Sequence, residues 1–253
     1  MKASRIIAIE KYIHTHGSVS LDELCDVFKV SKNTIRRDVD IILKKGTITK
    51  VYGGVQALET NPLKPYTERD VVAAADKDKI AALAAQHIEP GDFVYIDSGT
   101  TTRHLIDYLD ADIACTVLTN NLDIMNACAD RSNITLHTIG NTFKQATRSF
   151  VGINLGDTIQ HYNITKAFMA ATAVSLTAGV TNSDLLEYDI KKNIVAVANE
   201  VLLLADATKF DKATLLTYAP LSAIDTVITS ASIPRSYLAY FEAQSIAVEQ
   251  VQD

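Results

Sequence analysis

Three short polar segments of the chain combine residue types that bind anions. Residues 97–102 read Asp-Ser-Gly-Thr-Thr-Thr and offer four hydroxyls and a glycine that permits close backbone approach to a ligand. Thr119 with Asn120 forms a second segment, and Asp206 with Lys209 adds a carboxylate and an ammonium. Singly, each segment could be a capped turn, a helix cap or a solvated ion pair. Together they predict a site for a phosphate-like anion. The 97–102 segment lacks the Gly-Lys-Ser/Thr ending of a nucleotide P-loop.

The elements that would position these segments alternate between strand and helix from residue 76 onward. We expect strands at residues 93–96, 116–118, 134–139, 167–170, 201–204 and 226–228. Apolar strands separated by helices are typical of a mostly parallel sheet that is covered by helices on both sides. Ligands of such sheets bind beyond the carboxyl ends of the strands, where the three polar segments would meet.

A second group of residues, near the N-terminus, could contact nucleic acid. Ser31 is a predicted helix N-cap, and Ile35, Val39 and Ile42 recur at the spacing of one buried helix face. The outward side chains near the start of this helix are Lys32, Asn33, Arg36 and Arg37. A recognition helix meets bases and phosphates at this end, where its dipole also favours anions.

The elements around this helix predict a winged helix-turn-helix. A first helix spans residues 4–15, and Ser20 with Glu23 forms a capping box that starts a second. After Gly46, residues 47–55 indicate a β-hairpin, which would be the wing. The order of these elements favours a helix-turn-helix over a small helical interaction domain with a solvated basic face.

The charge of the chain is unevenly distributed. The 253 residues have a net charge of -6, which as an average disfavours nucleic acid as a partner. Residues 1–58 carry ten basic and six acidic side chains, whereas the other 195 carry 14 and 24. Two prolines in residues 60–65 indicate a linker. We predict a DNA-binding domain at 1–58, a linker at 59–75 and an effector domain at 76–253.

The cysteines and the apolar segments of the chain indicate whether it holds disulfides or metal ions and in which cellular compartment it is expected. The chain has three cysteines, Cys25, Cys115 and Cys128, and no two of them form a C-x-x-C pair. Neither a disulfide framework nor a metal site is therefore predicted. We expect no cofactor. Neither a signal peptide nor the roughly 18 apolar residues of a membrane span is evident. We therefore expect a cytoplasmic protein without membrane contact.

The first sixty residues resemble the DeoR-type bacterial transcription regulators. Residues 30–38, Val-Ser-Lys-Asn-Thr-Ile-Arg-Arg-Asp, with Gly46 and residues 52–54, Tyr-Gly-Gly, are similar to the recognition helix and wing of that family. The resemblance implies contacts to operator DNA. The predicted DNA-binding residues are Ser20, Ser31, Lys32, Asn33, Thr34, Arg36, Arg37, Lys50 and Tyr52.

The remaining chain resembles the sensor domain of the same family, which is similar in fold to ribose-5-phosphate isomerase and CoA transferases. The resemblance rests on residues 68–69, 78–81, 97–101, 119–120, 150–152 and 206–210 and implies a phosphorylated sugar as effector. The implied effector-binding residues are Asp97, Ser98, Gly99, Thr100, Thr101, Thr102, Thr119, Asn120, Gly140, Glu187, Asp206 and Lys209. In so acidic a domain we expect local amides and Lys209, rather than a broad positive field, to hold the anion.

These features predict a transcription regulator, a repressor of a carbohydrate-metabolism operon, and not an enzyme. Because helix-turn-helix proteins bind paired half-sites, we expect a homodimer or homotetramer. The alternative is a sugar-phosphate isomerase or transferase, for which Asp97, Glu187, Asp206 and Lys209 could supply acid/base groups. An architectural DNA binder with a vestigial sensor is a third possibility, which the intact 97–101 segment disfavours.

Overall fold

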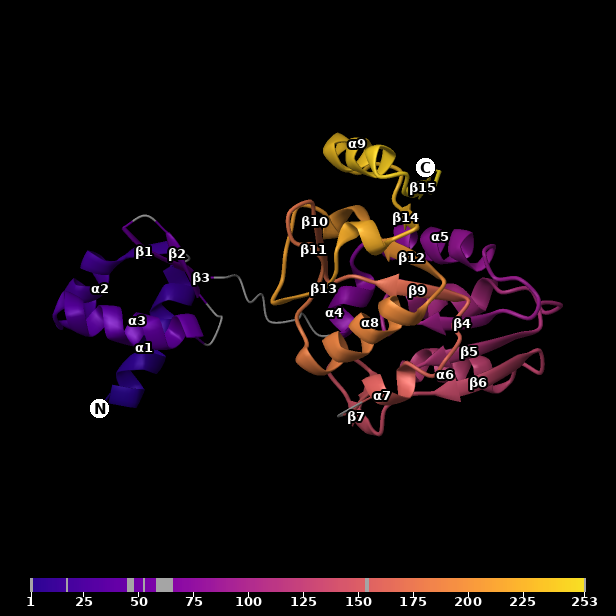
Figure 1. The fold of residues 1–253 in the computed structure, drawn as a ribbon, viewed down its shortest axis with the longest axis horizontal. Helices are drawn as coiled ribbons and strands as arrows, with labels where there is room; N and C mark the ends of the chain where they lie inside the picture. Colours follow the sequence, from indigo (N-terminus) through magenta and orange to yellow (C-terminus); the bar gives the residue numbers. More distant parts are fainter. Residues whose placement is uncertain are drawn as a thin grey trace. The chain divides into compact units, whose positions relative to one another are not determined.

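The computed structural model describes residues 2–16, 18–44, 48–51, 53–57, 66–152 and 155–252. The chain divides into two compact units, Met1–Pro62 and Leu63–Asp253 (Figure 1). Gly46, Tyr52 and the proline-containing segment 60–65 lie outside the described residues. Across the described ranges, no helix has the length and hydropathy that a membrane crossing requires.

The smaller unit is a winged helix-turn-helix, as predicted. Its helices are α1 (Lys2–His16), α2 (Leu21–Phe28) and α3 (Lys32–Lys44). The strands β1 (Ser18–Ser20), β2 (Ile48–Val51) and β3 (Gly54–Ala57) pair antiparallel in the order β1-β3-β2. Its core consists of Ile6, Ile9, Ile13, Val19, Leu24, Ile35, Val39, Ile42, Ile48 and Val55. The predicted buried face of α3 is therefore confirmed.

Side-chain caps set the starts of α2 and α3. Ser20 Oγ accepts a hydrogen bond from the Glu23 amide at 3.0 Å, and Ser31 Oγ accepts one from the Thr34 amide at 3.4 Å. The Glu23 carboxylate accepts from the hydroxyl of Tyr12 at 3.1 Å. One half of the predicted capping box is thus present, and Glu23 ties α2 to α1.

The larger unit is built on a seven-stranded parallel sheet in the order β15-β14-β12-β9-β4-β5-β6. The strands are β4 (Phe93–Ile96), β5 (Cys115–Thr119), β6 (Ile134–Thr138), β9 (Lys166–Ala170), β12 (Glu200–Ala205), β14 (Thr226–Thr229) and β15 (Ala247–Gln250). All six predicted strands are present, which confirms the α/β fold class. The edge strand β15 was not predicted.

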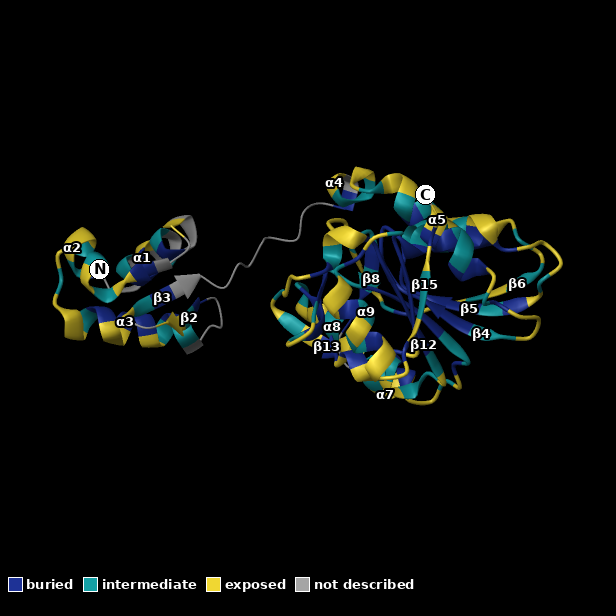
Figure 2. Cartoon of the chain, turned by 90° about the horizontal axis from the view of Figure 1, so that it is seen from above, coloured by how far each residue is buried: buried dark blue, intermediate teal, exposed yellow. Residues whose placement is uncertain are grey.

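Helices cover both faces of this sheet, so its central strands are buried on both sides (Figure 2). In β4, Val94 and Ile96 belong to the core under α5 (Ala74–Ala85), η1 (Thr102–Tyr108) and α6 (Leu122–Ala129). Tyr95 points into the opposite core, under α7 (Gly156–Ile159), α8 (Leu185–Val197) and α9 (Arg235–Ala243). Burial on both faces explains why these strands are continuously apolar.

Several small elements extend from the carboxyl edge of the sheet. The strands β10 (Ala173–Ser175), β11 (Gly179–Asn182) and β13 (Leu216–Ala219) form an antiparallel sheet, and β7 (Thr142–Lys144) pairs with β8 (Ser149–Val151). The short helices are α4 (Tyr66–Val71), η2 (Ala207–Lys209) and η3 (Leu221–Ala223). Helix α4 and the first residues of α5 lie in the range 59–75 that was predicted as linker. This segment is instead part of the larger unit, on which buried Tyr66 docks it.

Candidate functional site

A pocket lies beyond the carboxyl ends of β4 and β9 in the larger unit. Its lining combines backbone, hydroxyl and charged groups from α4, the β4–η1 loop, the segment after β9, β11, α8 and η2. The lining residues are Arg69, Ser98, Gly99, Thr100, Thr101, Ala170, Ala171, Thr172, Asn182, Glu187, Lys191 and Lys209. The structure thus brings six of the twelve predicted effector residues into one pocket: Ser98, Gly99, Thr100, Thr101, Glu187 and Lys209.

The loop after β4 forms one wall of the pocket. A Cβ on Gly99 would lie 2.3 Å from the Cβ of Ala170, so only glycine allows the loop to pass this close to β9. Gly99 donates its amide to Thr102 Oγ1 at 3.0 Å, which tightens the turn. Within the described chain, the amides of Thr100 and Thr101 make no hydrogen bond. Those amides and the two hydroxyls are available to an anion.

Asp97 does not line the pocket but organises its base. Its buried carboxylate forms an ion pair with Lys191 and accepts the amides of Ser98 at 2.8 Å and Ala170 at 2.9 Å. The Lys191 ammonium also lies 5.5 Å from the ring centroid of Tyr218. Asp97 therefore holds the loop, β9 and α8 together, and it places Lys191 at the pocket.

Glu187 lines the pocket, and its two carboxylate oxygens are held by neighbouring side chains. One oxygen accepts from the hydroxyls of Ser149 at 2.8 Å and Ser98 at 3.2 Å. The other accepts from the amide of Asn182 at 3.4 Å. Three neutral donors stabilise this carboxylate, and through two of these bonds Glu187 orients Ser98 and Asn182 at the pocket.

Cationic side chains converge on the pocket although the unit as a whole is acidic. Arg69, Lys191 and Lys209 line it, and Lys77 lies directly behind with its ammonium bonded to the Arg69 carbonyl. Burial lowers the pKa of Lys77 to about 8; the nearby Lys209 contributes to this and Asp206 opposes it. Burial also lowers the pKa of Arg69. Desolvated cations in this number favour an anionic ligand.

Lys191 was missed by the sequence interpretation, and Arg69 was named only as part of the family resemblance, not as an effector residue. Arg69 lies in the range that was read as linker. Lys191 follows Glu187 by four residues on α8, so the two share one helix face. That spacing was a usable signal. The sequence interpretation named Lys209 beside local amides, and the structure adds Arg69 and Lys191 to the lining.

Thr102, Thr119 and Asn120, three predicted effector residues, support the pocket from behind. Each is buried, and Thr102 Oγ1 donates to the Asp97 carbonyl at 2.6 Å. Thr119 Oγ1 donates to the Ile96 carbonyl at 2.7 Å. Asn120 accepts from the hydroxyl of Tyr95 at 3.1 Å and donates to the Phe150 carbonyl at the same distance. These bonds join the ends of β4, β5 and the β8 hairpin.

Gly140 and Asp206 also lie outside the pocket lining. Gly140 has φ +96°, and a Cβ there would lie 2.6 Å from the carbonyl carbon of Phe150. Asp206 Oδ1 caps η2 by accepting the amide of Thr208 at 2.9 Å. Its Oδ2 is buried and has no hydrogen-bond partner in the described structure. Asp206 therefore acts on the pocket through its charge near Lys77, rather than by lining it.

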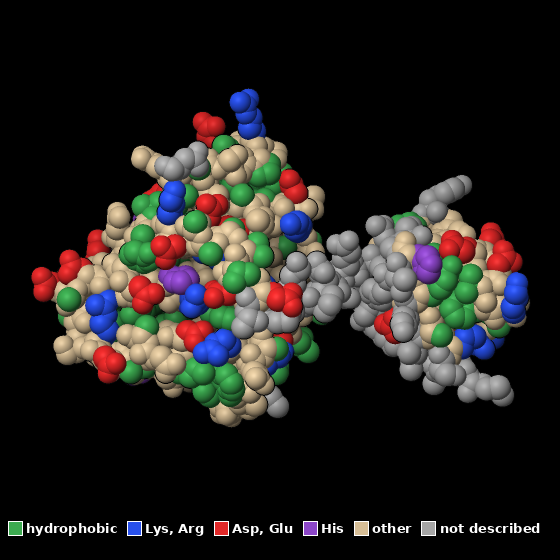
Figure 3. Space-filling view, turned by 180° about the vertical axis from the view of Figure 1, so that it is seen from behind, with side chains coloured by type: hydrophobic (Ala, Val, Ile, Leu, Met, Phe, Trp, Pro, Cys, Tyr) green, Lys and Arg blue, Asp and Glu red, His purple; other side chains and the backbone are tan. Residues whose placement is uncertain are grey.

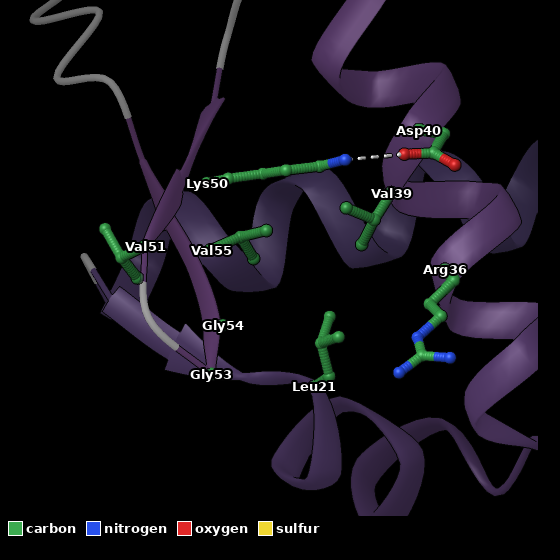
Figure 4. Close-up of a pocket in the computed structure, with 9 residues that line it drawn as sticks. All are labelled: Leu21, Arg36, Val39, Asp40, Lys50, Val51, Gly53, Gly54 and Val55. Atoms are coloured by element: carbon green, nitrogen blue, oxygen red, sulfur yellow. Dashed lines mark ion pairs between the residues drawn. The ribbon is translucent and has the colours of Figure 1, made fainter.

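The smaller unit carries a groove between α3 and the wing (Figure 4). It is lined by Leu21, Arg36, Val39, Asp40, Lys50, Val51, Gly53, Gly54 and Val55. Lys50 reaches across it to Asp40 at 3.3 Å, and both side chains are exposed. Exposed pairs of this kind contribute about 0–1 kcal/mol, so Lys50 can exchange Asp40 for a phosphate at little cost.

The predicted DNA-contacting residues of α3 lie on its outer face. Lys32, Asn33, Arg36 and Arg37 are exposed, and Lys32 pairs with the exposed Asp22 at 2.6 Å. Neither arginine has an ion-pair partner among the described residues. Ser20, Ser31 and Thr34 lie at the starts of α2 and α3, and Tyr52 is not described.

The face shown in Figure 3 contrasts the two units. Lys and Arg side chains gather at one edge of the smaller unit, whereas acidic and basic side chains are interspersed over the larger one. This distribution matches the separate segment charges read from the sequence.

Comparisons with known proteins match both units. A DeoR-like helix-turn-helix domain matches residues 5–61, and a DeoR C terminal sensor domain matches residues 72–231. The HTH-type transcriptional regulator IolR of Bacillus subtilis (strain 168) is 51% identical over 248 residues, 98% of this chain and 99% of that protein. The HTH-type transcriptional repressor GlcR of the same bacterium is 27% identical, over 89% and 87% of the two chains.

Among solved structures, ribose 5-phosphate isomerase A from Methanocaldococcus jannaschii is similar over 53% of each chain. The TM-score is 0.39 and the sequence identity 18%. A likeness at this level transfers no activity.

Proposed function

Because the chain belongs to the DeoR family of transcription regulators, we propose that it represses a carbohydrate-metabolism operon under the control of a phosphorylated sugar. The observation that carries this proposal is the convergence of Arg69, Lys191 and Lys209 on the hydroxyl-rich loop after β4. The relatives are transcription regulators, which decides against the isomerase or transferase alternative. Such a regulator would act on DNA in the bacterial cytoplasm.

The lining of the pocket offers partners for both parts of a phosphorylated sugar, the phosphate group and the hydroxyls. The amides and hydroxyls of Thr100 and Thr101, with the three cations, supply donors for a phosphate group. Asn182 and Glu187 supply an amide and a carboxylate for sugar hydroxyls. An effector can change operator affinity only by binding the two conformations of the protein with different affinities. We therefore place the switch in the elements that both line the pocket and connect to the DNA-binding unit.

The DNA-binding half of the proposal is tested with Arg36 and Arg37. Replacing both with alanine should weaken operator binding by at least about 30-fold, since each contact to a base or phosphate is worth about 1–3 kcal/mol. The control is the double variant Lys192→Ala with Arg235→Ala, which removes two exposed positive charges from the larger unit. Equal operator affinity of the two double variants, measured by fluorescence anisotropy at one salt concentration, would contradict the assignment of α3.

The effector half is tested by thermal melting of the full chain with a panel of phosphorylated sugars and their unphosphorylated counterparts. We expect a phosphorylated sugar to raise the melting temperature and its unphosphorylated form to have no effect, because the cations require an anion. The stabilising compound should also change operator affinity. Stabilisation by none of the panel would favour an architectural DNA binder. Conversion of the compound to a product would favour an enzyme.

We also propose that the chain acts as a homodimer or homotetramer. Residues 1–58 have a net charge of only +4, and they are attached to an acidic larger unit, so one DNA-binding unit alone would bind DNA weakly. Two units on paired half-sites would add their contacts. Sedimentation equilibrium of the full chain tests this, and a monomer at the concentrations that bind operator would contradict it.

A further inference from the structure

Helix α4 is the first described element after the segment 58–65, through which the chain arrives from the DNA-binding unit. It also contributes Arg69 to the lining of the pocket. The short helix α4 therefore links the proposed effector site to the segment 58–65 that leads to the DNA-binding unit. No other described element combines these two positions.

Few contacts hold α4 on the larger unit. Tyr66 is buried, at 4% exposed, and its amide donates to the Ala146 carbonyl at 3.3 Å. Asp70 pairs with Arg103 through two contacts of 2.8 Å each. The outer end is open to solvent, with Val71 74% exposed. A helix of six residues has no stability of its own, so α4 stays helical only while it is docked.

These contacts connect α4 to the same loop that forms the wall of the pocket. Arg103, the partner of Asp70, follows the Ser98–Thr102 loop directly, and its amide donates to the Gly99 carbonyl at 3.2 Å. Lys77 on α5 holds the Arg69 carbonyl from the other side. A ligand seated in the loop would therefore meet α4 both through Arg69 and through the Arg103–Asp70 pair.

The electrostatics of the pocket couple this docking to an anion. Docking brings the Arg69 guanidinium toward the ammonium groups of Lys191 and Lys209, and Lys77 lies close behind. Burial of the guanidinium has a desolvation cost, which lowers the pKa of Arg69, and the nearby acidic groups Glu187, Asp70 and Asp97 offset only part of it. A bound anion would give the guanidinium a further partner and so favour the docked form.

We propose that an anion bound in the pocket stabilises the docked form of α4 through Arg69, and that this step transmits effector binding to the segment that leads to the DNA-binding unit. The inference rests on the proposed effector function of the pocket. It assigns Arg69 as the transmitting residue, whereas Lys191 and Lys209 hold the anion without being attached to the connecting segment. The two conformations that effector binding must distinguish are then docked and undocked α4.

Hydrogen–deuterium exchange of the full chain, with inorganic phosphate as the probe, tests this proposal. In the wild type, saturating phosphate should slow exchange in residues 98–103 and also in residues 66–71. The slowing in 66–71 should be about ten-fold, because it equals the ratio of phosphate affinities of the docked and undocked forms, and one charge-assisted contact is worth about that factor. The Arg69→Gln variant should bind phosphate more weakly, and at a phosphate concentration that saturates the variant it should retain the slowing in 98–103 and lose it in 66–71.

Two further variants sharpen the result. Lys192→Gln, which removes an exposed positive charge from α8, should behave like the wild type. Arg69→Lys should restore part of the slowing in 66–71, because it keeps the charge. Slowing in 98–103 without slowing in 66–71 of the wild type would overturn the coupling and leave the pocket as an anion site. Slowing in neither segment would overturn the proposed function together with the coupling.

Discussion

Lys191 and Asp97 form an ion pair with almost no access to solvent, since their side chains are 6% and 1% exposed. The pair joins the middle of α8 to the end of β4, 94 residues apart in the chain. It places an ammonium at the pocket and anchors the carboxylate that accepts the amides of the adjoining loop and strand. Stability of the larger unit and cation placement in the pocket therefore depend on the same two residues.

Replacing Lys191 with methionine should destabilise the larger unit by about 3–5 kcal/mol, because it leaves the Asp97 carboxylate buried without a partner. Urea unfolding followed by far-UV circular dichroism measures this. Lys192→Met, at the exposed neighbouring position, should change the free energy of unfolding by less than about 0.5 kcal/mol. The double variant Lys191→Met with Asp97→Asn should recover part of the loss. Equal losses of unfolding free energy in Lys191→Met and Lys192→Met would mean that the ion pair does not stabilise the larger unit.

Replacing Gly99 with alanine should distort the loop after β4, because the new Cβ would lie 2.3 Å from the Cβ of Ala170. We expect a loss of about 1–3 kcal/mol in unfolding free energy, as for other overpacked sites, together with a loss of phosphorylated-sugar binding. Gly91→Ala is the control, since it meets no atom within 4 Å and introduces only the strain of a residue at φ +88°. Unchanged effector binding in Gly99→Ala would show that the loop does not contact the effector.

Lys77 should make stability rise with pH between about pH 8 and pH 10.5. Its pKa is about 8 in the folded chain and 10.5 when unfolded, so the unfolded state binds more protons in this window. The Lys77→Met variant lacks this proton uptake. The wild type should therefore gain on the order of 2 kcal/mol relative to the variant as the pH is raised across the window. A pH-independent difference between them, measured by urea unfolding, would contradict the burial of a charged lysine.

Replacing Thr100 with glutamate should separate effector binding from DNA binding. The added carboxylate would occupy the pocket and repel a phosphate, whereas the DNA-binding unit is untouched. Operator affinity without effector should stay within about two-fold of the wild type, and its response to the phosphorylated sugar should disappear. Thr142→Glu, at an exposed position on β7, is the matched control and should respond normally. A normal response in Thr100→Glu would place the phosphate elsewhere.

The elements of both units could be predicted because their signals are local. Ser20 and Ser31 as helix caps and the buried spacing of Ile35, Val39 and Ile42 depend only on neighbours within a few residues. The six predicted strands were visible as apolar runs for the same reason. The edge strand β15 escaped notice because its exposed and half-buried residues carry no such run.

Which polar residues would face the pocket was less predictable. Thr119 and Asn120 follow a strand just as Ser98 does, yet their side chains bond to neighbouring strand ends, whereas Ser98 lines the cavity. Position at the edge of the sheet was readable from the chain, but side-chain direction was not. That direction depends on which hydrogen-bond partners the adjacent strands and the β8 hairpin supply.

The sequence by itself determined two units of opposite charge, a recognition helix with an outward basic end, and a hydroxyl-rich loop after β4. Each follows from residue order and local physical chemistry. Only the tertiary structure decided that Arg69 and Lys191 join that loop, since they come from α4 and α8, nearly 30 and 90 residues away in the chain. Buried charges settle where a partner compensates them, and such partners meet only when the sheet is assembled.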